Sequence, residues 1–86
     1  MELTVYGELR AATGTKTVEL DADVETVDDA IAAFIEAYPR ARSRLLDEDG
    51  DVRPSVRVTL DGERVDGDAA CPDDAEIRLF PAMQGG

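Results

Sequence analysis

The C-terminal segment "LFPAMQGG", from Leu79 to Gly86, combines a proline, a short spacer and two terminal glycines. Pro81 cannot donate to a strand ladder, so it predicts the end of the preceding strand. A three-residue spacer then leads to Gly85 and Gly86. Glycine has no Cβ, so a Gly-Gly end can enter a narrow channel and present a bare carboxylate. We expect this carboxylate to be the reactive group of the chain; the alternative is an end that is merely frayed.

Phe80 stands directly before this tail. Period-two alternation in "EIRLF" (76–80) puts Ile77 and Leu79 on the core face of a strand and Phe80 on the other face. An aromatic side chain on a polar face beside the tail is a candidate anchor for a partner protein. The other interpretation, which the sequence leaves open, is that the ring folds over the strand end and packs locally.

Catalysis by side chains has little support in this sequence. There is no histidine and only one cysteine, which excludes histidine-based acid/base catalysis, Ser-His-Asp triads and Cys/His zinc sites. A reactive thiol needs cationic neighbours, whereas those of Cys71 are acidic, so we interpret it as a buried or half-buried structural residue. The run "DEDGD" (47–51) lacks the ligand alternation of a calcium-binding loop, and we expect a solvated turn there. No catalytic residue, bound cofactor or metal is predicted.

The charge balance excludes some classes of partner. With 20 acidic and nine basic residues, the formal net charge is −11, which repels nucleic acid and anionic membranes. Lys16 is the single lysine, and the acidic residues are mostly aspartate. Such a composition suits molar salt, where the Debye length falls to about 3 Å, so we expect a halophilic source. No signal peptide or membrane-spanning run is visible, and we expect a cytoplasmic protein.

The strands that must position the tail are predicted from alternating apolar residues. The segments "ELTVY" (2–6), "KTVEL" (16–20) and "EIRLF" (76–80) each alternate like a strand with one buried face. The segment "VRVTLDGERV" (56–65) is typical of a hairpin, because Asp61-Gly62 is a favoured pair for a type I′ turn. These segments together predict one sheet.

One long helix is predicted to cover that sheet. In "TVDDAIAAFIEAYP" (26–39), Thr26 is a good N-cap, apolar residues recur at helical spacing and Pro39 marks the end. A helical turn within 7–14 and a short second helix over 40–46 are also expected. Because one helix cannot cover both faces of a sheet, the prediction is an α+β fold: a mixed sheet with the main helix packed on one face. We expect a folded domain over residues 1–81 and a flexible Gly-Gly tail over 82–86.

This order of elements resembles the β-grasp, ubiquitin-like sulfur carriers. These include the small subunit of molybdopterin synthase, the thiamine-pathway sulfur carrier and the small archaeal modifier proteins. The resemblance covers nearly the whole chain, and it is carried by "VYGELRAATG" (5–14), the helix at 26–39, "VTLDGERV" (58–65) and the closing "LFP…GG". The acidic, lysine-poor composition favours a haloarchaeal small-modifier-like member.

The resemblance implies a mechanism in which the carrier supplies no catalytic side chain. An E1-like, ubiquitin-activating-type enzyme uses ATP to adenylate the terminal carboxylate, here that of Gly86. Sulfur then attacks the acyl adenylate to give a thiocarboxylate, or the acyl group passes to a target lysine. By position, Gly85 lets the carboxyl group enter the partner's site, and Phe80 and Arg10 match positions that contact the partner.

The tail departs from the family pattern, in which Phe-Pro-Pro-Val often precedes the last three residues. Ala82 replaces the second proline, and Met83 takes the partner-contacting position of the valine. These departures bear on which partner the tail fits, the molybdopterin synthase large subunit among them. Two roles stay open: sulfur donor for molybdopterin synthesis or tRNA thiolation, and modifier joined by an isopeptide bond to target lysines. The rival from another class is a ubiquitin-like interaction module with an inert tail.

Overall fold

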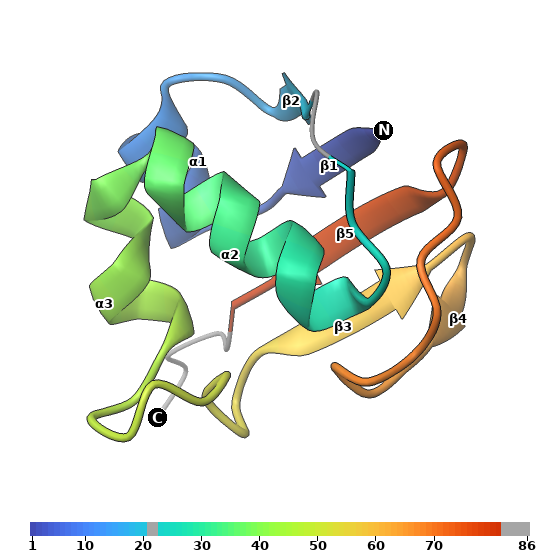
Figure 1. The fold of residues 1–86 in the computed structure, drawn as a ribbon. Helices are drawn as coiled ribbons and strands as arrows, with labels where there is room; N and C mark the ends of the chain where they lie inside the picture. Colours follow the sequence, from blue (N-terminus) through green and yellow to red (C-terminus); the bar gives the residue numbers. More distant parts are fainter. Residues whose placement is uncertain (21–22, 82–86) are drawn as a thin grey trace.

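Five strands form one mixed sheet in the computed structural model, which describes residues 1–20 and 23–81. The sheet order is β2-β1-β5-β3-β4. Central β1 and β5 are parallel, and all other neighbours are antiparallel, so the predicted mixed sheet is confirmed (Figure 1). The strands are β1 (Glu2–Val5), β2 (Thr17–Glu19), β3 (Arg57–Leu60), β4 (Glu63–Arg64) and β5 (Glu76–Phe80).

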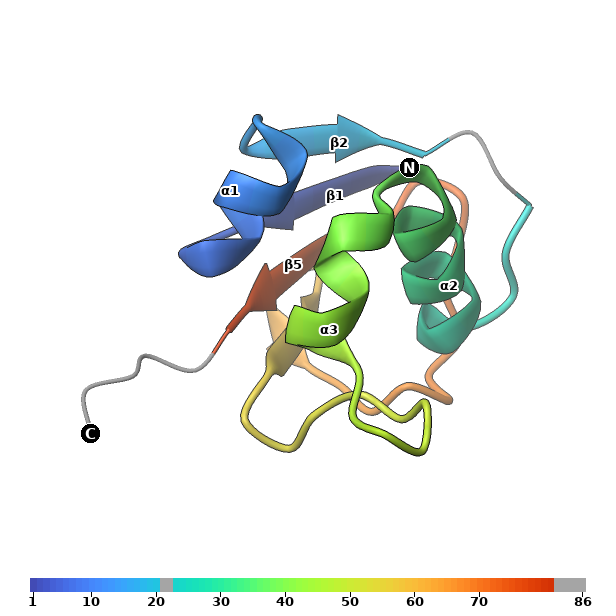
Figure 2. The same cartoon turned by 90° about the vertical axis from the view of Figure 1, so that its left-hand side faces the viewer.

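The helices lie together on one face of this sheet (Figures 1 and 2). They are α1 (Glu8–Thr13), α2 (Val27–Ala37) and α3 (Arg42–Leu45), with a 3₁₀ turn, η1, at Pro39–Ala41. Between the helices and the sheet lies an aliphatic core whose largest fully buried side chains are Phe34, Leu3, Leu9, Leu45, Ile77, Leu79, Val5 and Val27. No helix in the described part of the chain is long and apolar enough to cross a membrane.

The main helix α2 begins where the sequence predicts. The Thr26 hydroxyl accepts the Asp29 N–H at 3.2 Å, and the Asp29 carboxylate accepts the Thr26 N–H at 3.3 Å, which together form a capping box. Helix α2 ends at Ala37, before Pro39, because the residue that precedes a proline disfavours the helical conformation. A feature not predicted is that the 66–70 loop also caps this helix: the carbonyls of Gly67 and Ala69 accept the first helical N–H groups.

The β3–β4 hairpin has the predicted turn. Asp61 and Gly62 both have positive φ, 51° and 90°, as a type I′ turn requires. The turn is also tied to the centre of the sheet, since the Asp61 N–H donates to the Glu76 carbonyl at 2.9 Å.

No helix or strand of the described residues covers the face of the sheet opposite the helices, here called the open face. Part of this face is nevertheless buried. Thr4 lies on this open face, as its alternation predicts, but is only 7% exposed. The reason is its register: Thr17 of β2 and Arg78 of β5 are its direct neighbours on either side. Side chains in the middle of a central strand are covered by those of the flanking strands.

Candidate functional site

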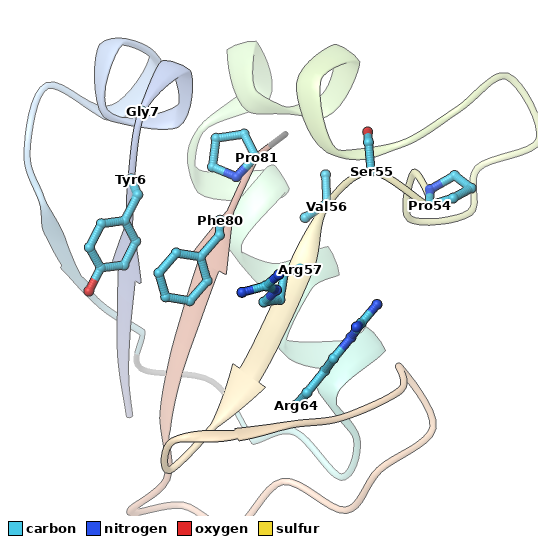
Figure 3. A pocket seen from close by; sticks show the side chains of 9 residues that line it. All are labelled: Tyr6, Gly7, Pro54, Ser55, Val56, Arg57, Arg64, Phe80 and Pro81. Atoms are coloured by element: carbon cyan, nitrogen blue, oxygen red, sulfur yellow. The ribbon is translucent and has the colours of Figure 1, made fainter. Parts of the chain in front are cut away.

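Phe80, the last residue of β5, lies on the open face and is half-buried. Its ring stacks on that of Tyr6, with ring centres 4.4 Å apart and planes at 9° (Figure 3). The stack forms because β1 and β5 run parallel, so that their C-terminal ends lie side by side at the same end of the sheet. The Tyr6 N–H, just beyond β1, donates to the Leu79 carbonyl at 3.2 Å and keeps the two segments together. The two interpretations of Phe80 are therefore compatible, since the ring packs locally and also remains partly exposed.

A groove of about 420 Å³ opens beside this aromatic pair (Figure 3). One wall is the aromatic pair with Pro81, and the other is the segment that leads into β3 together with Arg64, the last residue of β4. Its lining residues are Tyr6, Gly7, Pro54, Ser55, Val56, Arg57, Arg64, Phe80 and Pro81. The groove is thus part apolar and part cationic, and it includes Pro81, the last residue before the tail.

Gly7 sets how closely the start of the tail approaches the sheet. A Cβ at this position would lie 3.1 Å from Cγ of Pro81, tighter than ordinary contacts allow. Gly7 also has φ 58° and ψ −131°, a conformation that only glycine adopts readily. The glycine between β1 and α1 therefore lets Pro81 pack against the turn.

Charge on the open face is graded along the strands. The strand registers place Glu2 directly between Glu19 of β2 and Glu76 of β5, at the end of the sheet opposite to Phe80. At the tail edge, Arg57 is the direct neighbour of Phe80. This end of the open face is therefore basic, although the chain as a whole has a net charge of −11.

Arg57 and Arg64 are the cations of the groove. Both are exposed, and neither forms an ion pair with any residue of 1–20 or 23–81. Arg78 differs, because its guanidinium is bound at 2.7 Å by the Glu76 carboxylate. Two unpaired guanidinium groups beside an aromatic stack can accept an acidic and apolar surface from a partner.

Some residues singled out in the sequence lie elsewhere. Arg10 is exposed on α1 and is not among the lining residues of the groove, so its partner contact stays a prediction. Met83, Gly85 and Gly86 lie outside the described residues.

Three lining residues of the groove were not predicted from the sequence: Tyr6, Arg57 and Arg64. A signal for Arg57 was present: if Val56 and Val58 point inward, period two sends Arg57 outward with Phe80. What the pattern does not contain is the pairing of β3 with β5, which makes Arg57 and Phe80 neighbours.

Cys71 is buried, as predicted, and is 3% exposed. Burial raises the pKa of its thiol above the ordinary value, and the carboxylates of Asp61 and Asp73 raise it further, against a smaller opposing effect of the N-terminal ammonium group. The thiolate, which is the nucleophile, is therefore disfavoured. The geometry supports the structural interpretation of Cys71.

The acidic run at 47–51 forms a turn held by its own side chain. The Asp47 carboxylate accepts the N–H groups of Asp49 and Asp51, at 2.9 and 3.1 Å. Such a side-chain to backbone pattern is the usual reason for aspartate at the first position of a turn. This account of the run requires no bound ion.

The chain is similar to known proteins over nearly its whole length. The model of the ThiS family matches residues 3–86. The chain is 35% identical to small archaeal modifier protein 1 of Haloferax volcanii, in an alignment that covers the full length of both. The crystal structure of that protein superimposes with a TM-score of 0.93, at 32% identity and with 99% of this chain and 97% of the other covered. The Amycolatopsis orientalis BexX/CysO complex contains a chain that matches with a TM-score of 0.83 at 26% identity, covering 99% of this chain and 98% of that one.

These likenesses, together with the β-grasp sheet, define a small ubiquitin-like modifier or sulfur-carrier protein, a class whose members are not themselves enzymes. Within that class, the chain belongs to the ThiS family. The resemblance seen in the sequence is thereby confirmed over nearly the entire chain.

Proposed function

We propose that this protein is a carrier whose Gly86 carboxylate is adenylated by an E1-like enzyme with ATP. The activated group is then converted to a thiocarboxylate, joined to target lysines, or both. The observation that carries the proposal is that the aromatic and cationic groove includes Pro81, the residue directly before the Gly-Gly tail. The alternative is an interaction module whose tail is inert.

The chemistry accounts for the absence of a catalytic set on the carrier. A carboxylate is a poor electrophile at neutral pH, whereas an acyl adenylate has a good leaving group. The activating enzyme supplies the nucleotide and the catalytic groups, so the carrier needs only a reactive end and a surface by which it is held. In this proposal the binding energy comes from the groove and serves to position the carboxylate for reaction.

The groove has properties suited to an activating enzyme with an acidic and apolar contact surface. The Tyr6–Phe80 stack offers the kind of rigid aromatic area that dominates protein interfaces. Arg57 and Arg64 would favour carboxylates of the partner and disfavour cationic surfaces. Arg57→Ala should therefore weaken binding of the activating enzyme, and Arg40→Ala, an exposed arginine of η1 on the helix face, is the matched control.

The test is ATP–pyrophosphate exchange by the cognate activating enzyme. Removal of Gly86 shortens the reach by up to about 3.3–3.6 Å, which is more than attack within about 3–3.5 Å tolerates. We expect the truncated protein, and a protein with one residue added after Gly86, to lose exchange while their thermal melts match the intact protein. The Cys71→Ser variant should keep its rate of pyrophosphate exchange, because the sulfur would be carried on the terminal carbonyl carbon of Gly86 and not on a cysteine. Normal exchange by the truncated or extended protein would contradict the proposal and favour the inert tail.

The two roles of an activated tail differ in mass. Protein purified from its own cells would show replacement of oxygen by sulfur at Gly86 if it serves as a sulfur donor for molybdopterin synthesis or tRNA thiolation. A branched Gly-Gly remnant on lysines of other proteins would mark the modifier role. The proposal places both reactions in the cytoplasm of a halophilic cell, with the molybdopterin synthase large subunit as one candidate partner of the thiocarboxylate.

A further inference from the structure

Lys16 is the single lysine of the chain and therefore supplies its single side-chain primary amine. It is exposed and directly precedes β2, the strand at one edge of the sheet. Its backbone carbonyl accepts the Val5 N–H at 2.8 Å, which fixes the residue against the end of β1. Its ammonium group lies 5.6 Å from the centre of the Tyr6 ring, a cation–π distance. The one lysine thus stands beside the aromatic pair of the groove.

The other primary amine in the described residues is the partly buried α-amino group of Met1, which precedes β1. The α-amino group of Met1 donates to the Leu20 carbonyl at 3.3 Å and lies 4.0 Å from the Glu19 carboxylate. The Met1 side chain is only 2% exposed, so the residue cannot swing out without loss of packing. An electrophile from solution therefore meets Lys16 more readily than this α-amine.

We propose that Lys16 is the acceptor through which one copy of this protein is joined to another, and that this link withdraws the receiving copy from activation. The inference rests on the modifier role in the proposed function. In the step, the deprotonated Lys16 amine attacks the Gly86 acyl adenylate of a second copy. The amide C–N bond forms, the C–O bond to AMP breaks, and the amine proton passes to water.

The withdrawal follows from the position of the amine. An isopeptide at Lys16 places the Gly-Gly end of the second copy next to Tyr6, whose ring is stacked on Phe80. The tail and body of that copy then occupy space at the aromatic wall of the groove, where the activating enzyme would bind. A copy that has accepted another should thus be a poor substrate, although its own Gly86 is free.

The first experiment incubates the protein with the activating enzyme and ATP and compares it with Lys16→Arg. The arginine keeps a cation over Tyr6 but offers no acceptor amine. We expect covalent pairs from the unaltered protein, with a Gly-Gly remnant mapped to Lys16 by mass spectrometry, and none from the variant, whose fold is checked by circular dichroism. Pairs formed by Lys16→Arg, or a remnant at the α-amine, would overturn the inference.

The second experiment measures pyrophosphate exchange by the purified Lys16-linked pair. Only the receiving copy of the pair has a free Gly86, so exchange reports on that copy alone. We expect a rate at least about tenfold below that of the single protein, the scale of a lost aromatic anchor. An equal rate would overturn the withdrawal. If the single protein exchanges but no pair forms, the inference fails and the proposed function stands; if the single protein does not exchange, the proposed function itself fails.

Discussion

At the scale of the residue, two neighbours at the end of β5 are given opposite roles by strand alternation. Leu79 is fully buried between the sheet and the helices, and Phe80 stands on the open face against Tyr6. We predict that Phe80→Ala weakens binding to the activating enzyme by at least about 1 kcal/mol, as loss of an interface aromatic does. Leu79→Ala should instead lower the free energy of unfolding by about 2–5 kcal/mol, because it leaves a cavity in the core.

Binding titrations and urea unfolding of the two variants separate these roles. The unfolding loss for Phe80→Ala should be smaller than that for Leu79→Ala, since the ring is only half-buried. If both variants lose the same unfolding free energy, Phe80 is a core residue, and the anchor assignment is wrong.

At the scale of the element, the turn from β1 into α1 supports the end of β5. We predict that Gly7→Ala lowers the unfolding free energy by about 1–3 kcal/mol, the cost of a strained backbone conformation. It should also reduce pyrophosphate exchange, because the new Cβ would press on Pro81 at 3.1 Å and redirect the tail. Melts and exchange rates, both measured where the variant is fully folded, give the two effects.

Gly14→Ala is the matched control for this prediction. Gly14 ends the same helix with φ 74°, so alanine is strained there too. Among residues 1–20 and 23–81, however, no residue outside this helix and the adjoining chain has an atom within 4 Å of the added Cβ. This variant should lose stability and keep its exchange rate. Equal exchange rates for the two variants would show that the contact between Gly7 and Pro81 has no part in directing the tail.

At the scale of the whole molecule, self-repulsion at a net charge of −11 should make stability depend on salt. We predict that the thermal midpoint rises markedly between about 0.1 and 1 M KCl, where the Debye length falls from about 10 to about 3 Å. Thermal melts followed by circular dichroism give the midpoint. A midpoint that does not change over this range would remove the argument for a halophilic source.

The row of glutamates on the open face provides an internal check on that explanation. Glu2 has Glu19 and Glu76 as direct cross-strand neighbours, and like charges in such positions are destabilising. Glu2→Gln should therefore raise the midpoint at about 0.1 M KCl and have a smaller effect at about 1 M, where the repulsion is already screened. The same gain at both concentrations would indicate a cause other than charge.

Local sequence patterns are enough to predict most of the helices and strands and the faces that they bury. Thr26 and Asp29 cap α2 within a few residues of each other, the Asp61-Gly62 pair makes its turn locally, and Leu3, Val18 and Ile77 point inward because a strand has a period of two. Each of these features depends on contacts between residues close in the chain, so each is visible in a short window of sequence. From the sequence we also predicted that no side chain of this protein serves in catalysis, and that the reactive group lies in the tail.

The groove beside Phe80 and Pro81, in contrast, depends on how distant strands pair. Tyr6, Arg57 and Phe80 come from three strands, and their contact depends on the parallel pairing of β1 with β5 and the antiparallel pairing of β3 with β5. Register between strands far apart in the chain is set by packing of the whole core, which no local pattern encodes. The same holds for Lys16, whose place beside Tyr6 follows from the fold of the sheet edge. Alternation therefore predicted Phe80 as a contact residue, but the surface that it forms with Tyr6, Arg57 and Arg64 could not be predicted from the sequence.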